Sequence, residues 1–186
     1  MDGVEGLAPA MYVKPYQSVA IVAQEPTDAL QHVSDPQHRA MLQQHSTLPR
    51  RETGLLPGAL LTNKYLKFIC KNVFVKLNKD ESKYFKNIKK NILELHIAHN
   101  DGNYFCSNDE LKSLEDNNQI AVNYCGKNGE VTEKFNPNGS INNIAGIFNK
   151  NKNIIGMMPH PERMIDKYLS SNDGNFFFEN LIENLK

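Results

Sequence analysis

The composition of the chain changes sharply near residue 52, and this break limits how the chain can fold. From Met1 to Thr53 the sequence has no asparagine and a single lysine, Lys14. From Gly54 onward asparagine and lysine dominate the polar positions, and Gln119 is the one glutamine. Such a shift is typical of a boundary. We therefore divide the chain into 1–51 and 52–186. The first part is a separate domain, a disordered leader or an unrelated joined sequence, and the sequence leaves these alternatives open.

Strand-length apolar segments separated by turns fill most of 52–186. The last two segments are expected to pair as a hairpin, because a short polar turn joins them. The segments rich in β-branched and aromatic residues are 65–77, 91–99, 119–125, 143–148 and 153–158.

Two helices are expected in the same part of the chain. Asn108 should cap a helix over 109–115, whose first turn is acidic. The final helix should be capped near Asp173 and should bury an apolar face. The residues of that face are Phe177, Phe178, Leu181, Ile182 and Leu185. Before the break, 18–23 predicts a strand and 35–45 predicts a helix.

Charge and cysteine usage exclude several classes of protein. Acidic and basic side chains balance at 21 each, which argues against nucleic acid or an anionic membrane as a partner. No apolar run reaches the roughly eighteen residues of a membrane span, and early acids such as Asp2 and Glu5 argue against a targeting peptide. We expect a cytoplasmic protein. The widely spaced Cys70, Cys106 and Cys125 predict neither disulfides nor a zinc site, and Cys70 is expected to be a small core residue.

A His-x-Glu pair follows the last predicted strand. In Pro159-His160-Pro161-Glu162, the histidine can accept a proton from a nucleophile while the glutamate fixes its tautomer. The flanking prolines favour a rigid loop. The alternative is an exposed turn whose His160 and Glu162 face solvent. His38 and His45 are too far apart on one helix to bind a metal together, so we expect no metal site.

A series of motifs occurs in order along 52–186. They are Glu-Thr-Gly-Leu-Leu-Pro-Gly-Ala from Glu52, Leu-Lys-Phe-Ile-Cys from Leu66, Ile-Ala-His-Asn-Asp-Gly-Asn from Ile97, Asn-Asn-Gln-Ile-Ala from Asn117, Asn-Pro-Asn-Gly-Ser from Asn136, Asn-Ile-Ala-Gly-Ile from Asn143 and Gly-Met-Met-Pro-His-Pro-Glu-Arg from Gly156. Together they strongly resemble the glutaminase subunits of phosphoribosylformylglycinamidine synthase, which are class I glutamine amidotransferases.

The resemblance implies a doubly wound α/β sheet, here incomplete, with an atypical N-terminal segment over 1–51 and the C-terminal portion of an amidotransferase domain over 52–186. In that family a cysteine attacks the amide of glutamine and ammonia is passed to a synthetase subunit. The family's histidine and glutamate fall on His160 and Glu162. His99 is implied to line the glutamine pocket, with a structural histidine at a strand end as the alternative. The implied partners are the synthetase subunit and its small accessory subunit. ATP and magnesium would belong to the synthetase, and no cofactor is expected in this chain.

The nucleophile is the main departure from the family pattern. The family's Gly-x-Cys-Asn-Gly elbow would fall near Gln44, yet no cysteine precedes Cys70, and Ser46 lacks flanking glycines. A second departure is Asn100, where the family has a glycine. Two hypotheses follow. The chain is a glutamine-hydrolysing subunit, or it is a non-catalytic truncated or fused remnant that at most docks to the synthetase. We expect it to be inactive alone, because a base without its nucleophile retains little catalysis.

Overall fold

The structure is a computed structural model that describes residues 20–21, 56–79, 84–168 and 171–184. The predicted helix over 35–45, together with His38, His45 and Ser46, lies outside the described residues. So does most of 1–51.

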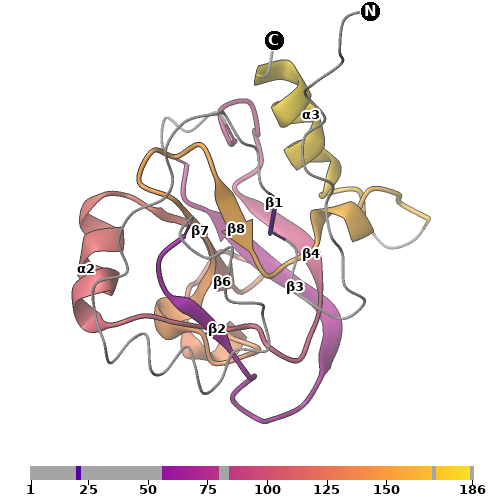
Figure 1. The fold of residues 1–186 in the computed structure, drawn as a ribbon. Helices are drawn as coiled ribbons and strands as arrows, with labels where there is room; N and C mark the ends of the chain where they lie inside the picture. The colour runs from indigo at the N-terminus through magenta and orange to yellow at the C-terminus, as the bar shows by residue number, and fades with distance from the viewer. Residues whose placement is uncertain (1–19, 22–55, 80–83, 169–170, 185–186) are drawn as a thin grey trace, which may run out of the picture.

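A six-stranded sheet forms the body of the molecule (Figure 1). Its strands follow the order β1-β8-β7-β6-β3-β4, and all of their pairings are antiparallel. Their bounds are β1 (Ala20–Ile21), β3 (Ile69–Leu77), β4 (Ile92–His99), β6 (Ile120–Cys125), β7 (Ile144–Phe148) and β8 (Ile155–Met157).

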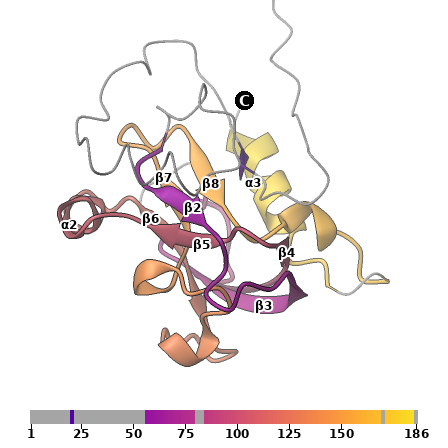
Figure 2. The same cartoon turned by 60° about the horizontal axis from the view of Figure 1, so that its bottom comes forward.

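A second sheet pairs β2 (Ala59–Leu61) with β5 (Asn103–Phe105), and the two strands run side by side in Figure 2. The α-helices are α2 (Asn108–Asp116) and α3 (Asn175–Asn184), which lie on opposite sides of the molecule in Figure 1. Three 3-10 helices complete the described elements: η1 (Glu133–Phe135), η2 (Ile141–Asn143) and η3 (Pro161–Arg163). The molecule is thus of the mixed α/β class that the sequence predicts.

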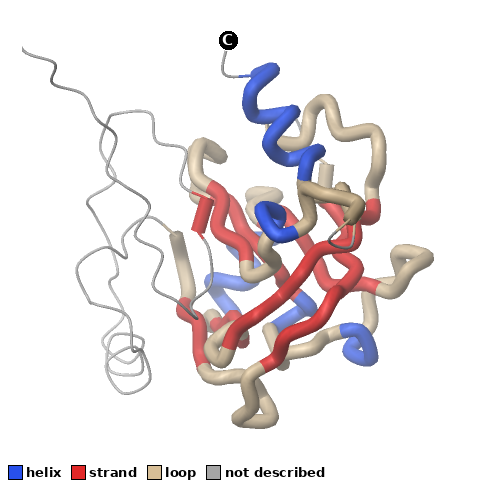
Figure 3. Tube along the Cα trace, turned by 90° about the vertical axis from the view of Figure 1, so that its right-hand side faces the viewer, coloured by secondary structure: helices blue, strands red, loops and turns tan. Residues whose placement is uncertain are grey.

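The main sheet is curled, so that its two ends approach each other. β8 and β4 are four positions apart in the strand order, which would separate them by about 19 Å in a flat sheet. Yet His160, three residues after β8, forms an antiparallel bridge with His96 on β4. Three residues span at most about 11 Å. The curl is therefore required by the chain itself, and Figure 3 shows the strands wrapping in this way.

Alternation along the strands explains which face of the sheet is buried. On β3, Val73, Val75 and Leu77 are buried, whereas Asn72 and Lys76 on the other face are exposed. This is the period of two that places successive side chains on opposite faces. β6 and β7, in the middle of the sheet, are buried along nearly their whole length. An aromatic cluster covers the core where α3 packs, and it consists of Tyr84, Phe85, Phe148 and Phe177.

All five strand segments predicted after the break are present, with ends shifted by a few residues. The predicted hairpin is formed by β7 and β8. Of the predicted strand over 18–23, the described residues Ala20 and Ile21 form β1, which pairs antiparallel with β8.

Two expectations about the helices were wrong. Ser107, not Asn108, caps α2: its side chain accepts from the Glu110 backbone N–H, and the Glu110 carboxylate accepts from the Ser107 N–H at 2.9 Å. This capping box was present in the sequence as Ser-Asn-Asp-Glu. α3 begins two residues after Asp173, close to the predicted cap. The Asp173 carboxylate itself binds the β4 region, since it accepts from the Glu94 N–H at 2.8 Å and from Lys90 at 2.6 Å.

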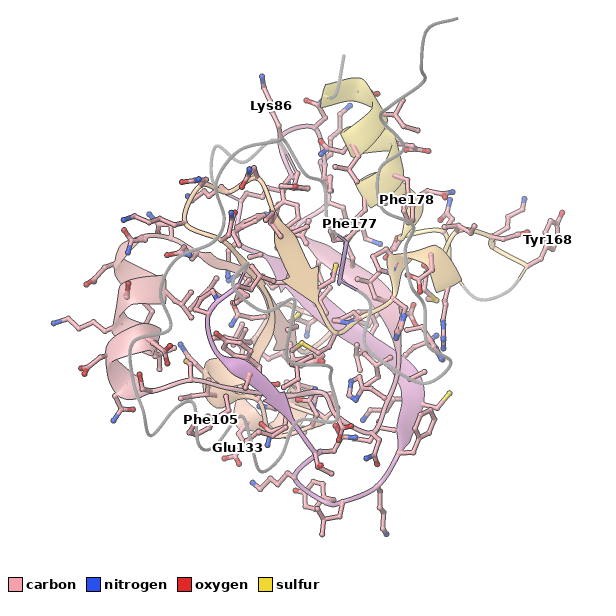
Figure 4. All side chains as sticks on the ribbon, in the orientation of Figure 1. Lys86, Phe105, Glu133, Tyr168, Phe177 and Phe178 are labelled. Atoms are coloured by element: carbon pink, nitrogen blue, oxygen red, sulfur yellow. The ribbon has the colours of Figure 1, made fainter. Side chains whose placement is uncertain are left out.

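The second error concerns the buried face of α3. Phe177 is buried as predicted, but Ile182 is 63% exposed. Figure 4 shows the side chains in place, with Phe177 at the base of α3 and Tyr168 projecting away from the molecule on the loop after η3. Among the described residues, no helix combines the length and apolar character needed to cross a membrane.

Candidate active site

His160 and Glu162 form a tight pair at the start of η3. The His160 side chain is 2% exposed, and its Nδ1 lies 2.8 Å from Glu162 Oε1. A carboxylate can only accept, so Nδ1 carries a proton, and in the neutral ring Nε2 holds the lone pair. Nε2 is buried and has no hydrogen-bond partner among the described residues. The imidazole is therefore oriented as a base whose acceptor atom is free.

The carboxylate of Glu162 is held in its charged form. Partial burial would raise its pKa, but the hydrogen bond from His160, a backbone hydrogen bond and the charge of Arg163 together leave the pKa below its ordinary value. An ionised Glu162 both orients the imidazole and stabilises the imidazolium that forms when Nε2 takes a proton. The exposed-turn alternative for this loop fits only Glu162, which is 41% exposed.

The curl of the sheet places His160. Its backbone N–H donates to the His96 carbonyl at 2.7 Å, so the residue completes the outer edge of β4. Behind the loop, the Gly174 N–H donates to the Met164 carbonyl at 2.8 Å. A methyl group on Gly174 would overlap the carbonyl oxygen of Pro161, so only glycine permits this close approach. Asp173 then ties the same segment to β4.

His99, at the end of β4, is a second buried imidazole with a free acceptor nitrogen. Its Nδ1 lies 3.1 Å from Asn63 Oδ1, which also accepts from the Gly102 N–H at 3.0 Å. The Asn63 Nδ2 donates to the carbonyls of Lys67 and His99, so Oδ1 is the acceptor and His99 Nδ1 is the donor. His99 Nε2 then holds the lone pair, and it has no partner among the described residues.

His99 is electrostatically coupled to His160. Burial, followed by the charge that His160 can carry, lowers the pKa of His99 to about 4. His99 is therefore neutral near pH 7. His99 therefore presents an unprotonated Nε2, and the neutral form of His160 does the same.

A buried polar network fixes the loop that follows His99. Asn138 donates to the Gly102 carbonyl at 2.6 Å and to the Tyr124 hydroxyl at 3.0 Å. The Ser140 hydroxyl accepts from the Tyr104 N–H at 3.0 Å. Gly102 itself packs on the His99 ring, where a methyl group would overlap the imidazole. The Asn-Pro-Asn-Gly-Ser motif, which begins at Asn136, thus holds the Gly102 turn against His99.

The structure overturns the expectation that Cys70 is a core residue. Cys70 is exposed, because it points away from the core on the same face of β3 as Asn72, whereas Cys106 and Cys125 are buried. Its Sγ lies 3.4 Å from His96 Nε2. Its position inside a predicted strand suggested burial, but its side chain lies on the exposed face of that strand.

Sequence reasoning found His160, Glu162 and His99, and the structure brings all three to one region. It missed Asn63, which sets the tautomer of His99, and His96, which pairs with His160 through the backbone. Asn63 follows the Pro-Gly turn without any periodic pattern, so no sequence signal marked it. Within the described residues, no group of three or more His, Cys, Asp or Glu side chains could hold a metal ion.

Comparisons with known proteins place this geometry in context. The CobB/CobQ-like glutamine amidotransferase domain matches residues 39–176. The chain is 68% identical over 135 residues to "Phosphoribosylformylglycinamidine synthase subunit PurQ" of Pelagibacter ubique, covering 73% of this chain and 60% of that protein. It is 46% identical over 132 residues to the subunit of the same name from Aquifex aeolicus, covering 70% of this chain and 58% of that protein.

A solved structure is also similar. The "Structure of PurLQS from Thermotoga maritima" contains a chain that matches with a TM-score of 0.58 and 31% identity, covering 72% of this chain and 55% of that one. The chain therefore spans less than two thirds of the relatives that it matches. The match over 39–176 takes in most of the sequence and includes the His160–Glu162 pair. On this evidence, the chain belongs to the CobB/CobQ-like glutamine amidotransferase family.

Proposed function

We propose that this chain carries the general base of a glutamine-hydrolysing site, His160, and its orienting carboxylate, Glu162. Such a site supplies ammonia for phosphoribosylformylglycinamidine synthesis in purine biosynthesis. The observation that carries the proposal is the buried Nε2 of His160, which Glu162 orients from 2.8 Å and which has no partner among the described residues. In the reaction, Nε2 would take the proton of an attacking thiol and return it to the departing ammonia. Glu162 would stabilise the imidazolium in between.

His99 is proposed to line the glutamine pocket. Its free Nε2 can accept a hydrogen bond at neutral pH, because the His99 pKa of about 4 keeps the ring neutral and Nε2 without a proton. An acceptor of this kind suits the ammonium or amide N–H groups of glutamine. The neighbouring Asn63 and Gly102 hold the ring in place.

The thiol is the missing part. No cysteine precedes Cys70 within residues 1–186, and Cys70 itself contacts His96 rather than the Nε2 of His160. We therefore propose that the chain alone does not hydrolyse glutamine. In an amidotransferase, losing the nucleophile removes several orders of magnitude of rate even when the base remains.

The second candidate function is docking without catalysis. The similar chain from Thermotoga maritima shares this fold and comes from the structure of PurLQS, a complex of several subunits. We propose that this chain binds a synthetase subunit, together with a small accessory subunit, through the surface shared with that relative. ATP and magnesium would then be used by the synthetase and not by this chain.

Ammonia release from glutamine tests the proposal directly. The purified chain, with and without a synthetase subunit, should release no more ammonia than the same protein carrying His160→Ala. Glutamine-dependent release that His160→Ala abolishes would show that the chain does hold a nucleophile.

Binding provides a readout that needs no nucleophile. In the chain labelled with ¹⁵N at histidine, glutamine should shift the Nε2 resonances of His99 and His160, since both nitrogens are free to meet a ligand. The Nε2 resonance of His96, already beside Cys70, should move least. Unchanged His99 and His160 resonances at saturating glutamine, in a folded protein, would leave docking as the remaining function.

A further inference from the structure

Three polar side chains make a second nucleophile–base arrangement on the outer face of the β3–β4 pair. Cys70 Sγ lies 3.4 Å from His96 Nε2, and His96 Nδ1 lies 2.9 Å from Asn72 Oδ1. Asn72 and His96 are directly opposite each other across the two strands, so their side chains share a face. The cluster contains a nucleophile, a base within reach of it and a group that orients the base.

The direction of each hydrogen bond follows from the donors and acceptors. Asn72 Nδ2 donates to Glu94 Oε1 at 3.2 Å, which turns Oδ1 toward His96. An amide oxygen can only accept, so His96 Nδ1 is the protonated nitrogen and Nε2 carries the lone pair. Nε2 therefore accepts from the thiol of Cys70. Glu94 and Asn72 hold His96 in the one tautomer that can take the proton of Cys70.

The surroundings of His96 keep it in the basic form. Burial, followed by the charges of Arg163 and His160, lowers the pKa of His96, and Glu162 only partly offsets them. The imidazole is neutral near pH 7 as a result. Cys70 is exposed and can meet a reactant from solution. Cys106 and Cys125 are not placed to react in this way: both are buried, and burial raises the pKa of each to about 11.

We propose that Cys70, His96 and Asn72 form a reactive thiol site that undergoes exchange with small disulfides. The Cys70 proton moves to His96 Nε2, and Sγ attacks one sulfur of the disulfide. A new S–S bond forms while the old one breaks, and the departing thiolate takes the proton from His96. The small disulfide is reduced to one free thiol, and Cys70 is oxidised to a mixed disulfide.

The site lies next to the proposed glutaminase base but is separate from it. His96 and His160 are opposite each other in the bridge that closes the sheet, so they too share a face. A group attached to Cys70 on β3 would therefore sit across β4 from the His160–Glu162 pair. The inference does not depend on whether that pair hydrolyses glutamine.

The rate of exchange at Cys70 tests the proposal. The full chain is treated with oxidised glutathione, and with dithiodipyridine as a second probe, and the modified cysteines are located by peptide mass mapping. Cys70 should react about tenfold or more faster than a free peptide with the sequence of residues 66–74, and His96→Gln should remove that advantage. Asn72→Leu should slow the reaction, whereas Asn72→Asp, which still accepts from Nδ1, should preserve it.

Cys106 and Cys125 report whether each variant is folded, because they react only when the core opens. A folded His96→Gln protein that reacts as fast as the wild type would overturn the proposal. So would a wild-type Cys70 that reacts no faster than the free peptide. If His96→Gln exposes the two buried cysteines, the comparison of Asn72→Leu with Asn72→Asp decides: equal rates for these two variants would also overturn it.

Discussion

At the scale of single residues, the three histidines around β4 and η3 share one tautomer, and a different partner sets it in each. A carboxylate fixes His160, and the amide oxygens of Asn63 and Asn72 fix His99 and His96. In each ring Nδ1 donates and Nε2 accepts. The rings differ in the partner of Nε2. The thiol of Cys70 lies next to Nε2 of His96, whereas Nε2 of His99 and Nε2 of His160 have no hydrogen-bond partner among the described residues. Chemistry in this region therefore depends on which ligand or thiol reaches Nε2.

The low pKa of His99 predicts a loss of stability in mild acid. The folded protein does not protonate His99 until the pH nears about 4, whereas the unfolded chain does so from its ordinary pKa of 6.5. Because the unfolded state binds more protons between these values, stability falls as the pH falls through this window. From about pH 7 to about pH 5, this one group should cost about 2 kcal/mol.

Urea unfolding of the wild type and His99→Gln at both pH values measures this loss. The variant should lose less stability than the wild type in acid, and the two should respond alike between about pH 7 and pH 8. Parallel losses in acid would mean that His99 is protonated in the folded protein.

At the scale of elements, the strands of the main sheet were predictable and the two short strands of the second sheet were not. Alternating or continuous apolar runs marked β3, β4, β6, β7 and β8, because such patterns depend only on local sequence. β2 and β5 were missed, since each is three residues long and is stabilised by its partner rather than by its own pattern. The site residues divide in the same way. The pairing of His160 with Glu162 was predictable because the two residues are close in sequence, whereas the role of Asn63 depends on its contact with His99, far along the chain.

Gly174 provides a test of how the elements position the site. A side chain there would press on the carbonyl of Pro161, directly beside His160. Gly174→Ala should therefore cost about 1–3 kcal/mol of stability, the usual range for overpacking, and should displace the His160–Glu162 pair. Chemical denaturation measures the stability, and the histidine resonances report the displacement.

The neighbouring Asn172 supplies the matched control, because its side chain is exposed. Asn172→Ala should leave both the stability and the His160 resonances close to those of the wild type. Equal behaviour of the two variants would show that the loop tolerates a side chain at Gly174.

At the scale of the whole molecule, the curl of the sheet brings the site together. In a flat sheet, the residues after β8 could not reach β4, and His160 would be exposed at a free edge. The closing bridge instead buries His160 and places it beside His96 and near His99. The sequence carried no sign of this closure, because it depends on the register of strands far apart in the chain. The order of the motifs predicted the family but not the path by which the sheet returns on itself.

Hydrogen exchange of one amide tests the closure. The His160 N–H is bonded to the His96 carbonyl at 2.7 Å across the closing bridge, whereas the Tyr168 N–H is bonded to the exposed Asp166 side chain. If the sheet is closed in solution, the His160 amide should exchange roughly a hundredfold or more slower than that of Tyr168, because exchange requires the bridge to open. His160→Ala should keep most of this protection, since the bond is made by the backbone. Exchange of the His160 amide at the rate of Tyr168 would mean that the ends of the sheet are apart in solution, and that the base is not held where a substrate could meet it.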